Sequence, residues 1–176
     1  RINTWEENIV NDPSIRGEME LIWNDSSSTH ASYGPAQNLK SNIEIEKRGR
    51  WSQFVYPKNG YAIETKDQNW EDTDVSPLGM PEEEDWILHG PYGDRSFMRN
   101  VLAMHMANKQ GNYASRTKYV ELFVNGDYEG IYVLMEKIKR GSDRVDIAKL
   151  NPDEIAGDDL TGGYIFKTDW EPVDWR

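Results

Sequence analysis

The sequence predicts an α+β fold, an antiparallel sheet with one helix packed on it. Three observations lead to this prediction. Short apolar or alternating runs recur along the chain, one segment has clear helical periodicity, and the strongest pair of runs is joined by an Asn-Gly turn. The chain has 176 residues, enough for about one domain with a substantial core. Its 11% aromatic content indicates a folded chain rather than a disordered one.

The N-terminal part alternates between weak patterns and short strands. Residues 1–41 are expected to form an N-terminal extension with a first strand at 18–23, and the Ser-, Asn- and Gly-rich stretch at 24–38 is typical of a surface loop. Residues 42–176 are expected to form a single lobe. Its first strands are predicted at 42–47 and 61–65 from alternation, and at 85–89 from a short apolar run.

The clearest helix is predicted at 96–110, where apolar residues recur at the helical spacing. Asp94 or Ser96 can cap its N-terminus, and Gly111 stands where a left-handed C-terminal residue is expected.

Two β-rich runs at 117–124 and 130–135 flank Asn125-Gly126, a pattern typical of a β-hairpin. Both runs are apolar at nearly every position, so we expect a central pair of strands that is covered on both faces. A last strand is predicted at 163–168.

Charge and composition exclude several classes of function. The chain holds 31 acidic and 20 basic residues, a net charge of −11, which argues against binding to nucleic acid or to an anionic membrane surface. No apolar run approaches the ~20 residues of a membrane span. Without cysteine there is no disulfide, thiolate metal site or cysteine nucleophile. The chain starts with Arg, contains no signal peptide and has few residues after the last predicted strand, so we expect a fragment of a longer protein.

The basic residues gather in two segments of this acidic chain. They are Lys47, Arg48, Arg50 and Lys58 in the first, and Lys137, Lys139, Arg140, Arg144 and Lys149 in the second. Two interpretations stay open, an anion pocket formed by the two segments and ordinary local charge balance. In the first loop Gly49 allows close backbone approach, Ser52 offers a hydroxyl and Lys58 an ammonium for phosphate oxygens. The acidic run at 82–85 is expected to be a solvated turn, because consecutive carboxylates point in different directions.

Four ordered segments carry a resemblance to a known family. They are IEIEKRGRWSQFVYPKNGYAIE at 43–64, DVSPLGMPEEEDWILHGPYGDRSFMRNVLAMHMA at 74–107, RTKYVELFVNGDYEGIYVLMEKIKRGSDRVDI at 116–147 and TGGYIFKTD at 161–169. On these segments the chain resembles the N-terminal portion of the CotH-type kinase family, atypical protein kinases named for spore coat protein H.

The resemblance implies the N-lobe side of a protein-kinase-like fold that binds ATP and Mg²⁺ and phosphorylates protein Ser/Thr hydroxyls. The implied nucleotide-binding residues are Arg48, Gly49, Ser52 and Lys58 at the phosphate end, and Met135, Glu136 and Lys137 at the hinge that meets adenine. The helix would be the regulatory one, yet it carries Arg95 and Arg99 and no obvious glutamate partner for Lys58. In the family, the catalytic and metal-binding aspartates follow the TGGY segment. We therefore assign no catalytic or metal-binding residue and expect this chain alone to be inactive.

The resemblance also implies a secreted protein or one at a cell or spore surface, with a coat or surface protein as its substrate. Two alternatives remain. One is a non-catalytic extracellular interaction module on the same fold, and the other is a carbohydrate-binding module, which the seven Trp residues favour.

Overall fold

The structure is a computed structural model that describes residues 1–24, 37–157, 160 and 163–166. Its strands are β1 (Ile2–Asn3), β2 (Ile15–Trp23), β3 (Gln37–Arg48), β4 (Gly60–Lys66), β5 (Asp85–His89), β6 (Thr117–Val124) and β7 (Asp127–Glu136). Its α-helices are α1 (Trp51–Val55) and α2 (Arg99–Lys109), and a short 3-10 helix, η1, spans Pro77–Gly79.

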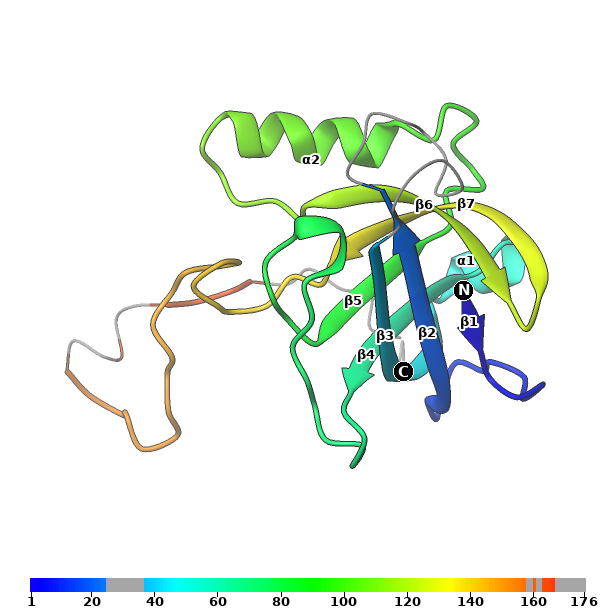
Figure 1. The fold of residues 1–176 in the computed structure, drawn as a ribbon. Coiled ribbons are helices and arrows are strands. Elements are labelled where there is room, and N and C mark those ends of the chain that lie inside the picture. Colours follow the sequence, from blue (N-terminus) through cyan, green and yellow to red (C-terminus); the bar gives the residue numbers. More distant parts are fainter. Residues whose placement is uncertain (25–36, 158–159, 161–162, 167–176) are drawn as a thin grey trace, which may run out of the picture. The chain divides into compact units, whose positions relative to one another are not determined.

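Within the described ranges the seven strands close into one barrel, in the order β1–β2–β3–β4–β5–β7–β6 (Figure 1). Neighbouring strands are antiparallel except β1 and β6, where Ile2 pairs with Val124 in parallel and closes the ring. The predicted α+β sheet of a kinase N-lobe is therefore wrong. The residues expected to form an extension supply β1, all of β2 and the start of β3, and closure leaves the sheet without a free edge.

The predicted strands at 18–23, 42–47, 61–65 and 85–89 lie within β2 to β5 and are confirmed. Alternate side chains of these strands point into the barrel. Ile43, Ile45 and Ile63 are almost fully buried there, and Trp86 is 1% exposed. This inward set forms the main core, because side chains on a strand alternate between its two faces.

The second half of strand β7, from Tyr132 to Glu136, is covered on both faces as its apolar sequence predicts, whereas the first half is largely exposed. Tyr132 and Leu134 face the barrel core, whereas Val133 and Met135 form a second cluster with Ile87. Two partly buried residues of α2, Val101 and Met104, pack against that second cluster. Its partner β6 is more exposed than expected, with Tyr119 47% exposed.

Helix α2 starts at Arg99, three residues after the predicted start. Asp94 is the residue that serves its N-terminus: its carboxylate accepts hydrogen bonds from the backbone N–H of Arg99 at 2.9 Å and of Ser96 at 3.0 Å. Gly111 has φ +83°, and the backbone N–H of Asn112 reaches back to the Ala107 carbonyl, so the predicted C-terminal end is confirmed.

The hairpin is also confirmed. Asn125 and Gly126 have φ of +50° and +90°, the positive values that a two-residue hairpin turn requires. A bulge after Leu122 leaves Gly130 opposite it, also with positive φ.

Contacts divide the chain into two compact units, residues 1–137 with the barrel and residues 138–176. In the second unit, residues 163–166 are not a strand, and Phe166 is 92% exposed. The strand predicted at 163–168 is thus wrong for those four residues, and the last two lie outside the described part. Across the described ranges, no helix has both the length and the apolar character needed to cross a bilayer.

Candidate functional site

The loop from β3 to β4 brings four of the predicted residues to one end of the barrel. Gly49 has φ +108°, and a Cβ built on it would lie 2.3 Å from the Ser52 hydroxyl oxygen, so no other residue fits here unstrained. The side-chain amide of Gln53 donates to the Gly49 carbonyl. Helix α1 starts at Trp51, two residues after Gly49, and none of its residues is buried.

Lys58 extends across the neighbouring strands. Its ammonium donates to the Glu129 backbone carbonyl at 2.9 Å and lies 4.2 Å from the centre of the Tyr132 ring. Burial lowers the pKa of Lys58, and the nearby Glu129 carboxylate acts in the opposite direction. The ammonium keeps donor capacity beyond the single carbonyl, because it has three N–H groups.

The three predicted hinge residues lie at the other end of β7. Lys58 meets β7 near Glu129 and Gly130, six or more residues before Glu136. At about 3.3 Å per residue, roughly 20 Å of extended strand separates the two groups. The structure therefore does not bring the two predicted groups together at one point.

Glu136 is fully buried and engaged in the fold. Its carboxylate accepts from the guanidinium of Arg116 at 2.7 Å and from the Arg116 backbone N–H at 2.8 Å. Met135 is 8% exposed in the cluster beneath α2, and Lys137 pairs with Asp85 at 2.8 Å. The side chains of Met135 and Glu136 thus have structural partners.

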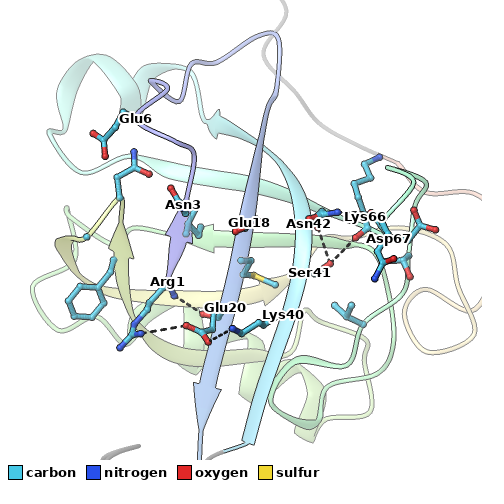
Figure 2. Close-up of a pocket in the computed structure, with 18 residues that line it drawn as sticks. Arg1, Asn3, Glu6, Glu18, Glu20, Lys40, Ser41, Asn42, Lys66 and Asp67 are labelled. Atoms are coloured by element: carbon cyan, nitrogen blue, oxygen red, sulfur yellow. Dashed lines mark hydrogen bonds and ion pairs between the residues drawn. The ribbon is translucent and has the colours of Figure 1, made fainter.

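Two larger hollows occur in the described part of the chain, and neither is lined by any of the seven predicted residues. The first, of about 1270 Å³, lies over β1, β2 and β3 (Figure 2). Its basic residues have acidic partners, since Glu20 meets Lys40 at 3.2 Å and Arg1 at 3.5 Å. The second, of about 1340 Å³, lies between α2 and the outer face of β6 and is mainly apolar.

Sequence reasoning missed a buried ammonium beside the first hollow. Lys66 has a side chain only 9% exposed and pairs with Asp72, with Glu64 at 3.2 Å and with Glu44 at 3.9 Å. The hydrogen bond to Asp72 raises the pKa of Lys66, while burial raises that of Glu64. The signal was present in the sequence, because Glu64 and Lys66 are two apart on one strand and share a face.

Three carboxylates gather at the β4–β5 connection. Oxygens of Asp74, Glu83 and Glu84 lie within 4.8 Å of one another, and sharing a hydrogen bond with Glu84 raises the pKa of Asp74. The cluster precedes β5, whereas Lys58 passes Gly90 just after β5. It is the one such group among the described residues and does not fit the metal of a nucleotide held by Lys58.

The tryptophans do not form one platform. Trp86 is a core residue, and the guanidinium of Arg16 lies 4.2 Å from the centre of the Trp70 ring. Trp51 and Trp5 are the strongly exposed ones among the described residues, at 76% and 54%. Trp170 and Trp175 lie outside the described part.

Comparison with known families gives the class of this chain. The family model described as CotH kinase protein matches residues 45–174. No curated protein matches the chain. The chain therefore belongs to the CotH kinase protein family, which is a kinase-like family and hence one of transferases, associated with the spore coat.

Proposed function

We propose that this chain is the ATP-binding part of a secreted or surface-located protein kinase that phosphorylates Ser/Thr hydroxyls. The observation that carries the proposal is the position of Lys58, whose ammonium is held at one end of the barrel by a carbonyl and a ring. Family membership supports the kinase class.

On this proposal the phosphates lie against Lys58 and the loop that starts at Arg48. Gly49 lets the backbone approach an anion closely, and the Ser52 hydroxyl beside it supplies a further donor. Phosphate transfer forms a bond between the acceptor hydroxyl oxygen and the γ-phosphorus and breaks the β–γ bridge. ADP leaves with the bridging oxygen, and the hydroxyl proton passes to the catalytic aspartate, which in the family follows the TGGY segment.

Mg²⁺ supplies charge neutralisation to such a transfer and needs hard oxygen ligands. The described carboxylate cluster lies at the wrong end of β5 for this role. We therefore assign ATP binding to this chain and expect no phosphate transfer from it alone. Labelled ATP with a mixed protein acceptor tests this, and transfer by residues 1–176 would show that the chain contains its own metal ligands.

The ATP-binding proposal is tested by calorimetric titration of the chain with Mg²⁺-ATP. Lys58→Met removes the ammonium and should weaken binding roughly tenfold or more, as expected for a charged hydrogen bond. The control is Lys109→Met at the end of α2, which should bind like the unchanged protein. Equal affinities for all three proteins would contradict the role of Lys58.

One observation favours a second function, a non-catalytic interaction or carbohydrate-binding module. In α1, Trp51 and Phe54 are 76% and 85% exposed. Aromatic faces of this kind bind sugars or partner proteins. A Trp51→Ala variant that loses glycan binding, together with an unchanged protein that binds no ATP, would favour this second function.

A further inference from the structure

The kinase resemblance implies a carboxylate that pairs with Lys58, and among the described residues the nearby Glu129 forms no such pair. No ion pair of Lys58 is found within the described residues, and its contacts are the Glu129 carbonyl and the ring of Tyr132. A cation over the face of a tyrosine ring is attracted by the ring quadrupole. The ring can therefore take the place of a glutamate in fixing the ammonium.

The ring of Tyr132 is itself immobilised. It is 0% exposed, and it stacks on the ring of Tyr61 with centroids 6.0 Å apart and an interplanar angle of 28°. Tyr61 is 6% exposed in the same core. A ring held in a packed core offers a fixed surface to the ammonium, which a side chain on an exposed helix would not.

Two glycines shape the path of the lysine side chain. A Cβ on Gly90 would lie 3.0 Å from Cγ of Lys58 and 3.1 Å from the Tyr132 ring. A Cβ on Gly130 would lie 3.2 Å from the Lys58 ammonium. Side chains at these two positions would crowd the lysine, so the glycines keep open the slot that leads it onto the ring.

We propose that Tyr132 is the positioning residue that holds the Lys58 ammonium for contact with phosphate, in the role that a glutamate would otherwise have. This inference rests on the proposed ATP binding. The ring rather than the hydroxyl holds the ammonium, because the ammonium lies 4.2 Å from the centre of the ring. Lys58 remains on the ring when phosphate binds and uses its remaining N–H groups for the phosphate oxygens.

The test compares Tyr132→Phe, which keeps the ring, with Tyr132→Leu, which removes it. We expect the Phe variant to bind ATP within about twofold of the unchanged protein and the Leu variant to bind about tenfold more weakly. Tyr119→Leu, on the exposed face of β6, is the control and should bind normally. In parallel, NMR of isotopically labelled lysine should show a ring-current shift of the Lys58 methylene protons that survives in Phe and disappears in Leu.

The outcomes separate the two proposals. If Lys58→Met abolishes ATP binding and a folded Tyr132→Leu leaves it unchanged, the ring has no positioning role although ATP binding stands. If the unchanged protein binds no ATP, the proposed function fails, and the NMR shift alone decides whether the ring holds the ammonium.

Should Tyr132→Leu fail to fold, phenylalanines with increasing fluorination at position 132 replace it, because they keep the shape and weaken the ring quadrupole. ATP affinity should then fall step by step with fluorination, and an affinity independent of fluorination would overturn the proposal.

Discussion

Glu136 was predicted to contact adenine, but its side chain has a structural role. Its carboxylate is buried at the end of β7 and accepts two hydrogen bonds from Arg116, with the Tyr113 hydroxyl at 3.4 Å. The following residue, Lys137, is the last of the barrel unit. The Glu136 side chain therefore fixes the point at which the chain leaves the barrel.

Arg116→Met tests this anchor. This variant leaves a buried carboxylate without its cation. We expect the free energy of unfolding, measured with urea, to fall by about 3 kcal/mol. The control is Lys137→Met, which breaks the more exposed pair with Asp85 and should cost less than about 1 kcal/mol. Replacing both members, as Arg116→Met with Glu136→Leu, should recover much of the loss. If Arg116→Met and Lys137→Met lower the free energy of unfolding by the same small amount, the pair of Arg116 and Glu136 does not anchor the end of β7.

Helix α2 depends on one carboxylate at its start. Hydrogen bonds from the Ser96 hydroxyl and then from the Arg99 N–H lower the pKa of Asp94 below its ordinary value of 3.8. Such a carboxylate stabilises the folded helix at pH values above 3.8, and this contribution is lost as the pH falls through the lowered pKa.

We therefore expect the protection of the amides at Arg99 and along the first turn of α2, relative to their intrinsic exchange rates, to fall as the pH drops below 3.8 and through the lowered pKa of Asp94. Asp94→Asn keeps an oxygen acceptor but cannot ionise. In this variant the same amides should be less protected already at neutral pH, and their protection should not change further in acid. If the variant shows the same loss of protection in acid, a group other than Asp94 causes it. NMR-detected exchange between pH 2.5 and 7 measures both.

The elements that could be predicted are those whose signals are local. The hairpin, the C-terminal end of α2 and four of the strands follow from turn chemistry and from period-two or helical spacing. Barrel closure could not be predicted in this way, because β1 has only two residues and its pairing with β6 joins segments more than a hundred residues apart. Propensity carries no information at that separation.

The candidate site was predictable to the same degree. Gly49, Ser52 and Lys58 are close in sequence, and the structure keeps them at one end of the barrel. Tyr132 lies in one of the two apolar runs of the hairpin, and nothing local indicates that a lysine 74 positions earlier lies over its ring. The direction in which a long side chain points depends on the strands packed around it.

For the molecule as a whole, closure of the barrel is held by Asn125. Its side-chain carbonyl accepts from the Thr4 backbone N–H at 2.8 Å, its amide donates to the Thr4 hydroxyl at 3.0 Å, and its own N–H donates to Ile2 at 2.9 Å. Thr4 is fully buried. The turn residue of the β6–β7 hairpin thus holds the residues around β1 in place through hydrogen bonds.

The variant Asn125→Gly keeps the backbone turn and removes the side chain that bonds to Thr4. Glycine adopts the positive φ of the turn as readily as asparagine does, so the β6–β7 hairpin should remain. The buried Thr4 N–H loses its partner, and the Thr4 hydroxyl keeps only the Glu7 carbonyl. We expect this to cost about 1–3 kcal/mol and to open the barrel between β1 and β6. Hydrogen–deuterium exchange should then rise in residues 1–10 and stay unchanged in β4 and β5, with Gly126→Ala as a control that strains the turn while leaving Asn125 in place. If residues 1–10 remain as protected in Asn125→Gly as in the unchanged protein, backbone pairing between Ile2 and Val124 closes the barrel without the side chain.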